Sequence, residues 1–203
     1  MRSRSLPLLP LLLVLAASSC GYNTIQTMDE RAAQAKKQIE VQLQRRADLV
    51  QNLVNTVKGY AAHEEAVFTN IANARTGLAG AVTRGDPKEM AQANEQLTGA
   101  IGRLLVIAEA YPQLKADQGF LRLQDELTGT ENRIAVARTD YNEMAGQYNA
   151  YIRRFPARIT AKVTGAKPRE YFEVTNPASL EAPTVDFSEI GRASCRERVY
   201  LCV

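Results

Sequence analysis

The chain has 203 residues, and its hydrophobic content of 45% is enough for one globular domain with a buried core. It has no Trp, 5 Phe and 8 Tyr, beside long runs of Ala, Gln, Glu, Arg and Leu, a composition that favours helices. One His and three Cys leave little for a metal site or for a catalytic dyad that needs imidazole.

The net charge of +3 is located at the two ends of the chain. Two arginines lie in the first 19 residues, and three arginines and two glutamates lie in the last fifteen. The rest of the chain contains 20 of the 25 basic residues and 20 of the 22 acidic residues, so it has no net charge. The neutral body argues against nucleic acid as a partner, because nonspecific phosphate binding needs an excess of Lys and Arg.

Residues 1–19 are typical of a bacterial signal peptide. Arg2 and Arg4 are followed by an apolar stretch, Leu6 to Ala16, that is shorter than the roughly 20 residues of a membrane-spanning helix. Small residues then lead directly to Cys20, an order that resembles a lipobox, whose Cys is acylated and becomes the new N-terminus. Two or more acyl chains would anchor the protein stably. The alternatives are an ordinary signal that leaves Cys20 as a free thiol and a single N-terminal membrane segment.

Residues 20–156 are expected to form an antiparallel up-and-down bundle of about four long helices. The first helix shows a seven-residue, coiled-coil-like spacing from Ile25 to Tyr60. The second stops at Gly85, and Asp86-Pro87-Lys88-Glu89 is a capping-box start for the third, which ends near Tyr111-Pro112. The fourth is expected from about Asp117 to Phe155, and its apolar residues also lie seven apart: Phe120, Leu127, Ile134, Tyr141, Tyr148 and Phe155.

Beyond Pro156 the helical period is lost. Residues 157–188 contain Gly and Pro between short β-branched stretches such as Ile159 to Val163, so an extended C-terminal tail is expected there. Residues 189–203 resemble the in-frame translation of a sequencing adapter. Cys195 and Cys202 then fall outside the natural chain, which leaves no intrachain disulfide.

Several stretches, in order along the chain, resemble the LemA family: G-Y-N from Gly21, I-E-V-Q-L-Q-R-R-A-D-L-V-Q-N-L-V from Ile39, V-K-G-Y-A-A-H-E from Val57, A-E-A-Y-P-Q-L-K-A from Ala108, L-T-G-T-E-N-R-I-A-V-A-R from Leu127 and Y-N-A-Y-I-R-R-F-P from Tyr148. The resemblance implies a helical bundle in the bacterial cell envelope, outside the cytoplasm, and a family with no established enzymatic activity. Residues 162–166 lack an aromatic that members often have after the Gly.

Few residues are candidates for chemistry, and no catalytic, cofactor-binding or metal-binding residue is predicted. His63 is expected to be polar surface at a helix start, since a single His makes a weak metal site. Arg46 falls at an apolar seam position, so its guanidinium either reaches the surface or meets a carboxylate, for which Glu131 and Glu109 are the candidates. Such a contact would fix how the helices align.

Two classes of function remain open. The first is a non-enzymatic scaffold that offers helix faces to another envelope protein, as a monomer or a homo-oligomer. The alternative is a small-ligand-binding protein with a cavity lined by the tyrosines and the Arg46 region. Direct contact with lipid or peptidoglycan is a third option, but the sequence shows no basic amphipathic face to support it.

Overall fold

The computed structural model describes residues 8–173, with side chains from residue 21 onward. The chain divides into two compact units, Met1–Glu173 and Val174–Val203. The second lies outside the described residues, and with it the predicted tail beyond residue 173 and the segment 189–203. Within residues 8–173 every regular element is a helix, as the all-α prediction requires.

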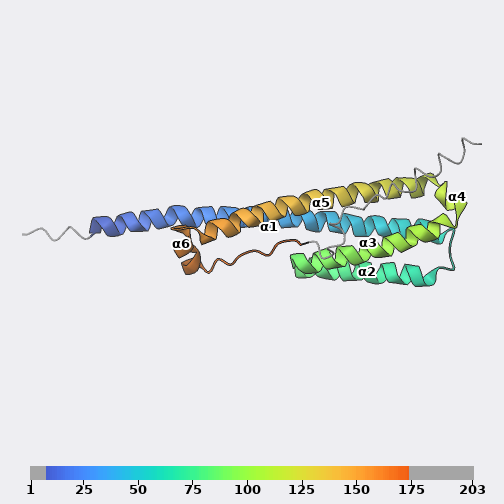
Figure 1. The fold of residues 1–203 in the computed structure, drawn as a ribbon, viewed down its shortest axis with the longest axis horizontal. Coiled ribbons are helices and arrows are strands. Elements are labelled where there is room, and N and C mark those ends of the chain that lie inside the picture. The colour runs from blue at the N-terminus through green and yellow to red at the C-terminus, as the bar shows by residue number, and fades with distance from the viewer. Residues whose placement is uncertain (1–7, 174–203) are drawn as a thin grey trace, which may run out of the picture. The chain divides into compact units, whose positions relative to one another are not determined.

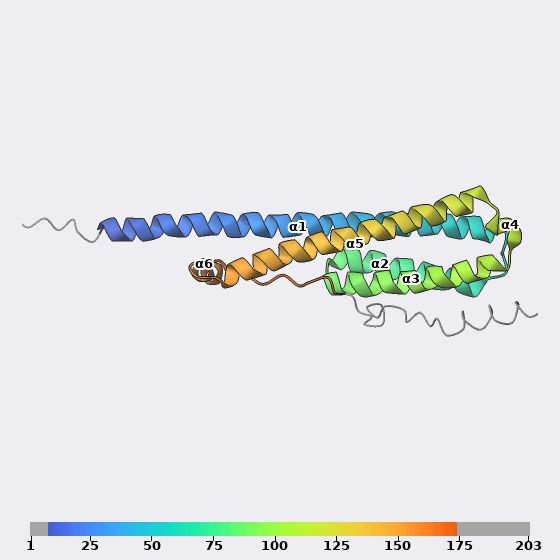
Figure 2. The ribbon, with the colours of Figure 1, turned by 45° about the horizontal axis from the view of Figure 1, so that its top comes forward.

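The two longest helices run side by side and form the main packing surface of the bundle (Figures 1 and 2). These are α1, Leu8–Lys58, and α5, Gln118–Arg153. The residues that the sequence places seven apart on each helix lie in this interface. Those within the two helices are buried: Ile25, Ala32, Ile39, Arg46 and Leu53 from α1, and Phe120, Leu127, Ile134, Tyr141 and Tyr148 from α5. Each pattern fails two residues past the end of its helix, where Tyr60 and Phe155 are exposed.

A helical hairpin packs beside the C-terminal half of α1 (Figure 2). It consists of α2, Glu65–Arg84, and α3, Pro87–Glu109. Gly85 ends α2 with φ 72°, a left-handed conformation that favours glycine, and Asp86 caps α3 by accepting a hydrogen bond from the Lys88 amide. The capping box is incomplete, because the Glu89 carboxylate pairs with Arg84 across the turn.

A short connection links the end of α3 to the start of α5. Helix α4, Pro112–Lys115, follows α3, and Asp117 then begins α5 by accepting a hydrogen bond from the Phe120 amide at 2.8 Å. The Tyr60 hydroxyl donates to the other Asp117 carboxylate oxygen at 3.3 Å. The cap of α5 is therefore also a contact between the loops that follow α1 and α4.

The buried apolar side chains form two clusters along α1. The larger contains α1 residues from Ile39 to Val57 together with residues of α2, α3, α4 and α5. The smaller consists of Ile25, Tyr148, Ile152 and Ala161. The bundle therefore has a section of four long helices and a narrower section in which α1 and α5 pack with α6.

Helix α6, Ala157–Thr164, forms where extended backbone was expected. Ala157 and Ala161 lie one turn apart and are both buried, and Gly165 ends the helix with φ 72°. The β-branched residues of this stretch favour strands only when a sheet is available to pack them. Residues 166–173 form no helix and run back along α5, in the part of the chain for which an extended tail was predicted (Figure 1).

Candidate functional site

A buried polar cluster joins three helices at the centre of the larger core. The Arg46 side chain from α1 is buried, and its Nη1 donates a hydrogen bond to Asn94 Oδ1 of α3 at 2.5 Å. The same nitrogen lies 2.6 Å from Glu131 Oε2 of α5. The structure thus brings Arg46 and Glu131 together as an ion pair and adds Asn94, a partner that the sequence did not suggest.

The cluster is not fully satisfied. Glu131 Oε2 is close enough for an ion pair, yet neither this oxygen nor Arg46 Nε takes part in a hydrogen bond among the described residues. Burial lowers the pKa of Arg46 below its ordinary value, and the nearby Glu131 charge opposes that shift. Burial lowers the pKa of Arg138 in the same way, opposed by Glu131 and Glu95. The arrangement supplies no nucleophile and fits a structural contact between helices.

The other predicted site residues lie elsewhere. Glu109 is the last residue of α3 and is exposed, away from the buried Arg46 cluster. His63 is exposed in the link between α1 and α2. Over residues 21–173, no three His, Cys, Asp or Glu side chains gather closely enough to bind a metal ion.

The extended segment after α6 is bound to α5 by two asparagine side chains. Asn149 accepts from the Arg169 amide at 2.8 Å and donates to the Arg169 carbonyl at 2.9 Å. Asn142 accepts from the Phe172 amide at 2.8 Å and donates to the Phe172 carbonyl at 3.0 Å. Each amide group therefore satisfies both backbone groups of one residue, as a neighbouring strand would in a sheet.

The spacing of these contacts follows from helix and strand geometry. Asn142 and Asn149 are seven residues apart, which is a rise of about 10.5 Å in a helix. Arg169 and Phe172 are three residues apart, which is about 10 Å in extended backbone. The two repeats match, so both asparagines reach backbone groups of one extended chain.

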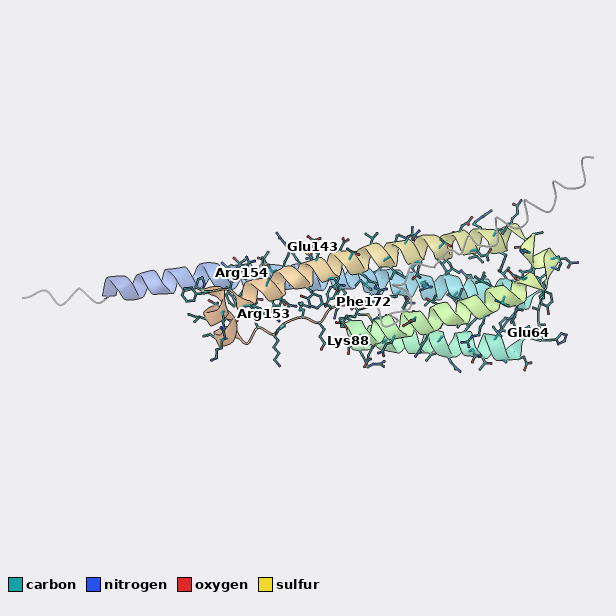
Figure 3. All side chains as sticks on the ribbon, in the orientation of Figure 1. Glu64, Lys88, Glu143, Arg153, Arg154 and Phe172 are labelled. Atoms are coloured by element: carbon teal, nitrogen blue, oxygen red, sulfur yellow. The ribbon has the colours of Figure 1, made fainter. Side chains whose placement is uncertain are left out.

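Side chains add further contacts to this tail. The Tyr141 hydroxyl donates to the Glu170 carbonyl at 2.7 Å, and Arg169 Nε lies 2.8 Å from Asp29 Oδ1 of α1. Phe172, labelled in Figure 3, is buried. The Arg138 guanidinium lies 4.7 Å from the centroid of its ring. Burial raises the pKa of Tyr141 above its ordinary value, while hydrogen bonding to Asp29 raises that of Arg169. The missing aromatic after Gly165 does not prevent docking, because Phe172 and the asparagines hold the segment.

Of the tyrosines on the fourth predicted helix, Tyr141 contacts this tail and Tyr148 packs in the smaller core. Tyr141 and Tyr148 are both buried, and the pKa of Tyr148 is raised by burial and by the Asp29 charge. Hollows of about 170, 360, 410 and 370 Å³ lie elsewhere on the described residues, and none of these four is lined by Arg46, Tyr141 or Tyr148. The cavity expected from the tyrosines and the Arg46 region is therefore not among them.

The end of the bundle that carries the predicted lipidation residue packs against α6. Cys20 lies in α1, and its side chain is outside the described set. A Cβ atom on the next residue, Gly21, would lie 3.5 Å from Thr160 Oγ1 of α6. None of the described helices combines the length and apolarity needed to cross a bilayer.

The sequence profile of the LemA family matches residues 35–187, which is most of the chain. The chain belongs to the LemA family. Two similar proteins are magnetosome protein MamQ 2 of Paramagnetospirillum magneticum, 31% identical over 175 residues, and magnetosome protein MamQ of Magnetospirillum gryphiswaldense, 31% identical over 174 residues. These matches cover 75% and 74% of the chain and 64% of each relative, so the chain spans just under two thirds of these curated relatives.

A third relative carries the family's name. Protein LemA of Metamycoplasma hominis is 24% identical over 157 residues, covering 77% of this chain and 69% of that protein. These similarities confirm the predicted family. They assign no reaction to the Arg46 cluster or to the tail contacts.

Proposed function

We propose that this LemA family protein is a membrane-tethered, non-enzymatic scaffold of the bacterial cell envelope, anchored through lipid on Cys20. The observation that carries the proposal is that the residues immediately after Cys20 already pack against the rest of the bundle. Gly21 adjoins Thr160, and Ile25 is fully buried in the smaller core. An anchor on Cys20 would therefore hold a packed bundle at the membrane without a flexible spacer.

The scaffold role is supported by apolar side chains exposed on long, well-packed helices. Val41, Val106 and Val136 are each more than half exposed, on α1, α3 and α5. Such positions are available to a second protein. Of the tyrosines that a ligand cavity would need, Tyr141 is bound to the Glu170 carbonyl of the tail and Tyr148 is buried in the smaller core. This contact with the tail favours the scaffold over the small-ligand alternative.

Metabolic labelling with an alkyne analogue of palmitate tests the anchor. The full chain is expected to take up the label and to float with membranes, and Cys20→Ser is expected to lose the label. Cys195→Ser and Cys202→Ser are matched controls and should retain it. Equal labelling of Cys20→Ser would refute lipidation at this residue.

Photo-crosslinking in host membranes tests the scaffold role. A crosslinking amino acid is placed at Val106, Val136 or Val41 in turn, and adducts are identified by mass spectrometry. We expect one recurrent envelope protein, or a second copy of the chain, to be captured from one of these positions and not from the others. Background alone at all three positions, in a correctly acylated protein, would contradict the scaffold and favour a small ligand.

A further inference from the structure

The region around α6 combines positive charge with exposed apolar side chains. Residues 144–168 contain five basic residues and no acidic one: Arg153, Arg154, Arg158, Lys162 and Lys167. All five are exposed. Figure 3 shows Arg153 and Arg154 where α5 ends beside α6. Residues 20–28 of α1, which lead into this end of the bundle, carry no charged side chain.

Helix α6 separates its small buried residues from larger exposed ones. Ala157 and Ala161 face the bundle and are buried. Ile159 and Val163 are one turn apart on the opposite side and are 59% and 82% exposed. Phe155, just before the helix, is 83% exposed.

The basic side chains flank this apolar surface. At 100° per residue, Arg158 and Lys162 lie on one flank of α6, between the buried alanines and the exposed Ile159 and Val163. A basic amphipathic face is therefore present where an extended tail was expected. Basic and apolar residues on one helix face are typical of segments that lie in the interface of an anionic bilayer.

Helix α6 lies beside the residue that follows the proposed acylated Cys20. A Cβ atom placed on that residue, Gly21, would be in van der Waals contact with Thr160 of α6. An anchor there keeps the α6 face close to the lipid headgroups, where its effective concentration is high. This step rests on the proposed tether.

We propose that α6 is a second membrane contact, which lays Phe155, Ile159 and Val163 against a bilayer of anionic phospholipids. The basic residues around it would bind the headgroups, each contributing about a fivefold gain in partitioning near an anionic surface. An eight-residue helix is too small to hold the protein alone, so the contact would orient a bundle that is already tethered. The four-helix section would then be held in one orientation relative to the membrane.

A single introduced tryptophan tests the contact, because the chain has no Trp of its own. The mature, acylated Val163→Trp protein is reconstituted in vesicles of phosphatidylcholine, with or without phosphatidylglycerol. We expect a blue-shifted emission that brominated lipids quench when phosphatidylglycerol is present, and a weaker effect in its absence or at high salt. Leu121→Trp, exposed near the start of α5 at the opposite end of that helix from α6, is the matched control and should keep a water-like spectrum.

Charge reversal tests the role of the basic residues. Arg158→Glu with Lys162→Glu, in the Val163→Trp protein, removes two positive charges and should lower the bound-to-free ratio of α6 by at least about 30-fold. Arg103→Glu with Arg122→Glu changes the net charge equally at exposed positions on α3 and α5 and should leave the signal unchanged. Circular dichroism before reconstitution verifies that each variant is folded.

The outcomes separate this proposal from the tether. If the acylated Val163→Trp protein floats with vesicles but its tryptophan keeps a water-like spectrum, the α6 contact is overturned and the anchor stays intact. A lipid-dependent tryptophan signal from a protein whose Cys20 is unmodified refutes the anchor, and it also overturns the proposed role of α6, because α6 would then bind lipid without a tether. A blue shift of the tryptophan emission that is equal in neutral and anionic vesicles shows that anionic phospholipid is not what α6 binds. A blue shift seen only in native membranes, which also contain envelope proteins, leads to the same conclusion.

Discussion

Replacing Arg46 with leucine tests what the buried polar cluster contributes to folding. The substitution removes a buried charge, but it also leaves Asn94 Oδ1 without the hydrogen bond it receives at 2.5 Å. Asn94 is only 5% exposed, and an orphaned buried acceptor costs about 1–3 kcal/mol. The Glu131 Oε2 atom is buried beside Arg46, but the side chain as a whole is 43% exposed, so the carboxylate can turn to water and adds little to the loss.

The expected change in melting temperature follows from that free energy. For a packed unit of this size, 1 kcal/mol corresponds to roughly 2–4 °C, so Arg46→Leu should lower the midpoint by about 2–12 °C. Asn94→Leu should also be destabilising, because it leaves the buried Arg46 without a hydrogen bond. The double variant removes both polar groups and should be more stable than either single variant, because replacing both partners of a buried hydrogen bond with apolar residues can be nearly neutral or stabilising.

Thermal and urea unfolding, followed by circular dichroism, measures all four proteins of this cycle. Hydrogen exchange of the α1 and α5 amides then reports whether the helices of the double variant still align in one way. If the double variant loses as much free energy of unfolding as the two single variants together, the loss in Arg46→Leu does not arise from Asn94. An Arg46→Leu protein as stable as the parent would refute the reasoning altogether.

Three further predictions follow from the contacts described. Asn149→Ala should leave the melting of the bundle nearly unchanged but speed hydrogen exchange at the Arg169 amide, because the docked segment can open locally; unchanged exchange would show that the asparagine does not hold it. Asp117→Ala should destabilise the protein by about 0.5–2 kcal/mol in urea unfolding, since it removes the cap of α5, and a neutral effect would contradict that role. The pKa values of Tyr141 and Tyr148 are raised, so the folded state favours their protonated forms, and stability should be retained below pH 10 and fall above it. Melting curves between about pH 9 and 11 measure this, and Tyr141→Phe should reduce the dependence.

The long helices could be predicted because their apolar pattern extends over many turns. The seven-residue spacing identifies the buried residues of α5 as far as Tyr148, and Asp86 and Asp117 mark helix starts through their side-chain chemistry. Helix α6 was missed because only Ala157 and Ala161 indicate its buried face. Two alanines within a β-branched and Gly-containing stretch are too short a pattern to reveal a helix that forms by packing on α1 and α5.

The candidate site was predictable in part. Arg46 stands out because a charge interrupts an apolar seam, and Glu131 is a reasonable partner on the facing helix. Asn94 and the tail-binding pair Asn142 and Asn149 gave no such signal, since a polar side chain on a helix usually faces water. The seven-residue spacing of the two asparagines, next to Tyr141 and Tyr148, is the pattern that could have identified them.

The way Asn142 and Asn149 hold the tail constrains its length more than its sequence. Both asparagines bind only main-chain groups, which every residue except proline offers in the same form. Substitutions at the exposed Glu170, Tyr171 and Glu173 would therefore preserve the pairing during evolution. One inserted or deleted residue between 169 and 172 would break it, because it shifts one contact by about 3.3 Å relative to the other. Indels should therefore be rarer than substitutions in this segment among relatives that retain both asparagines.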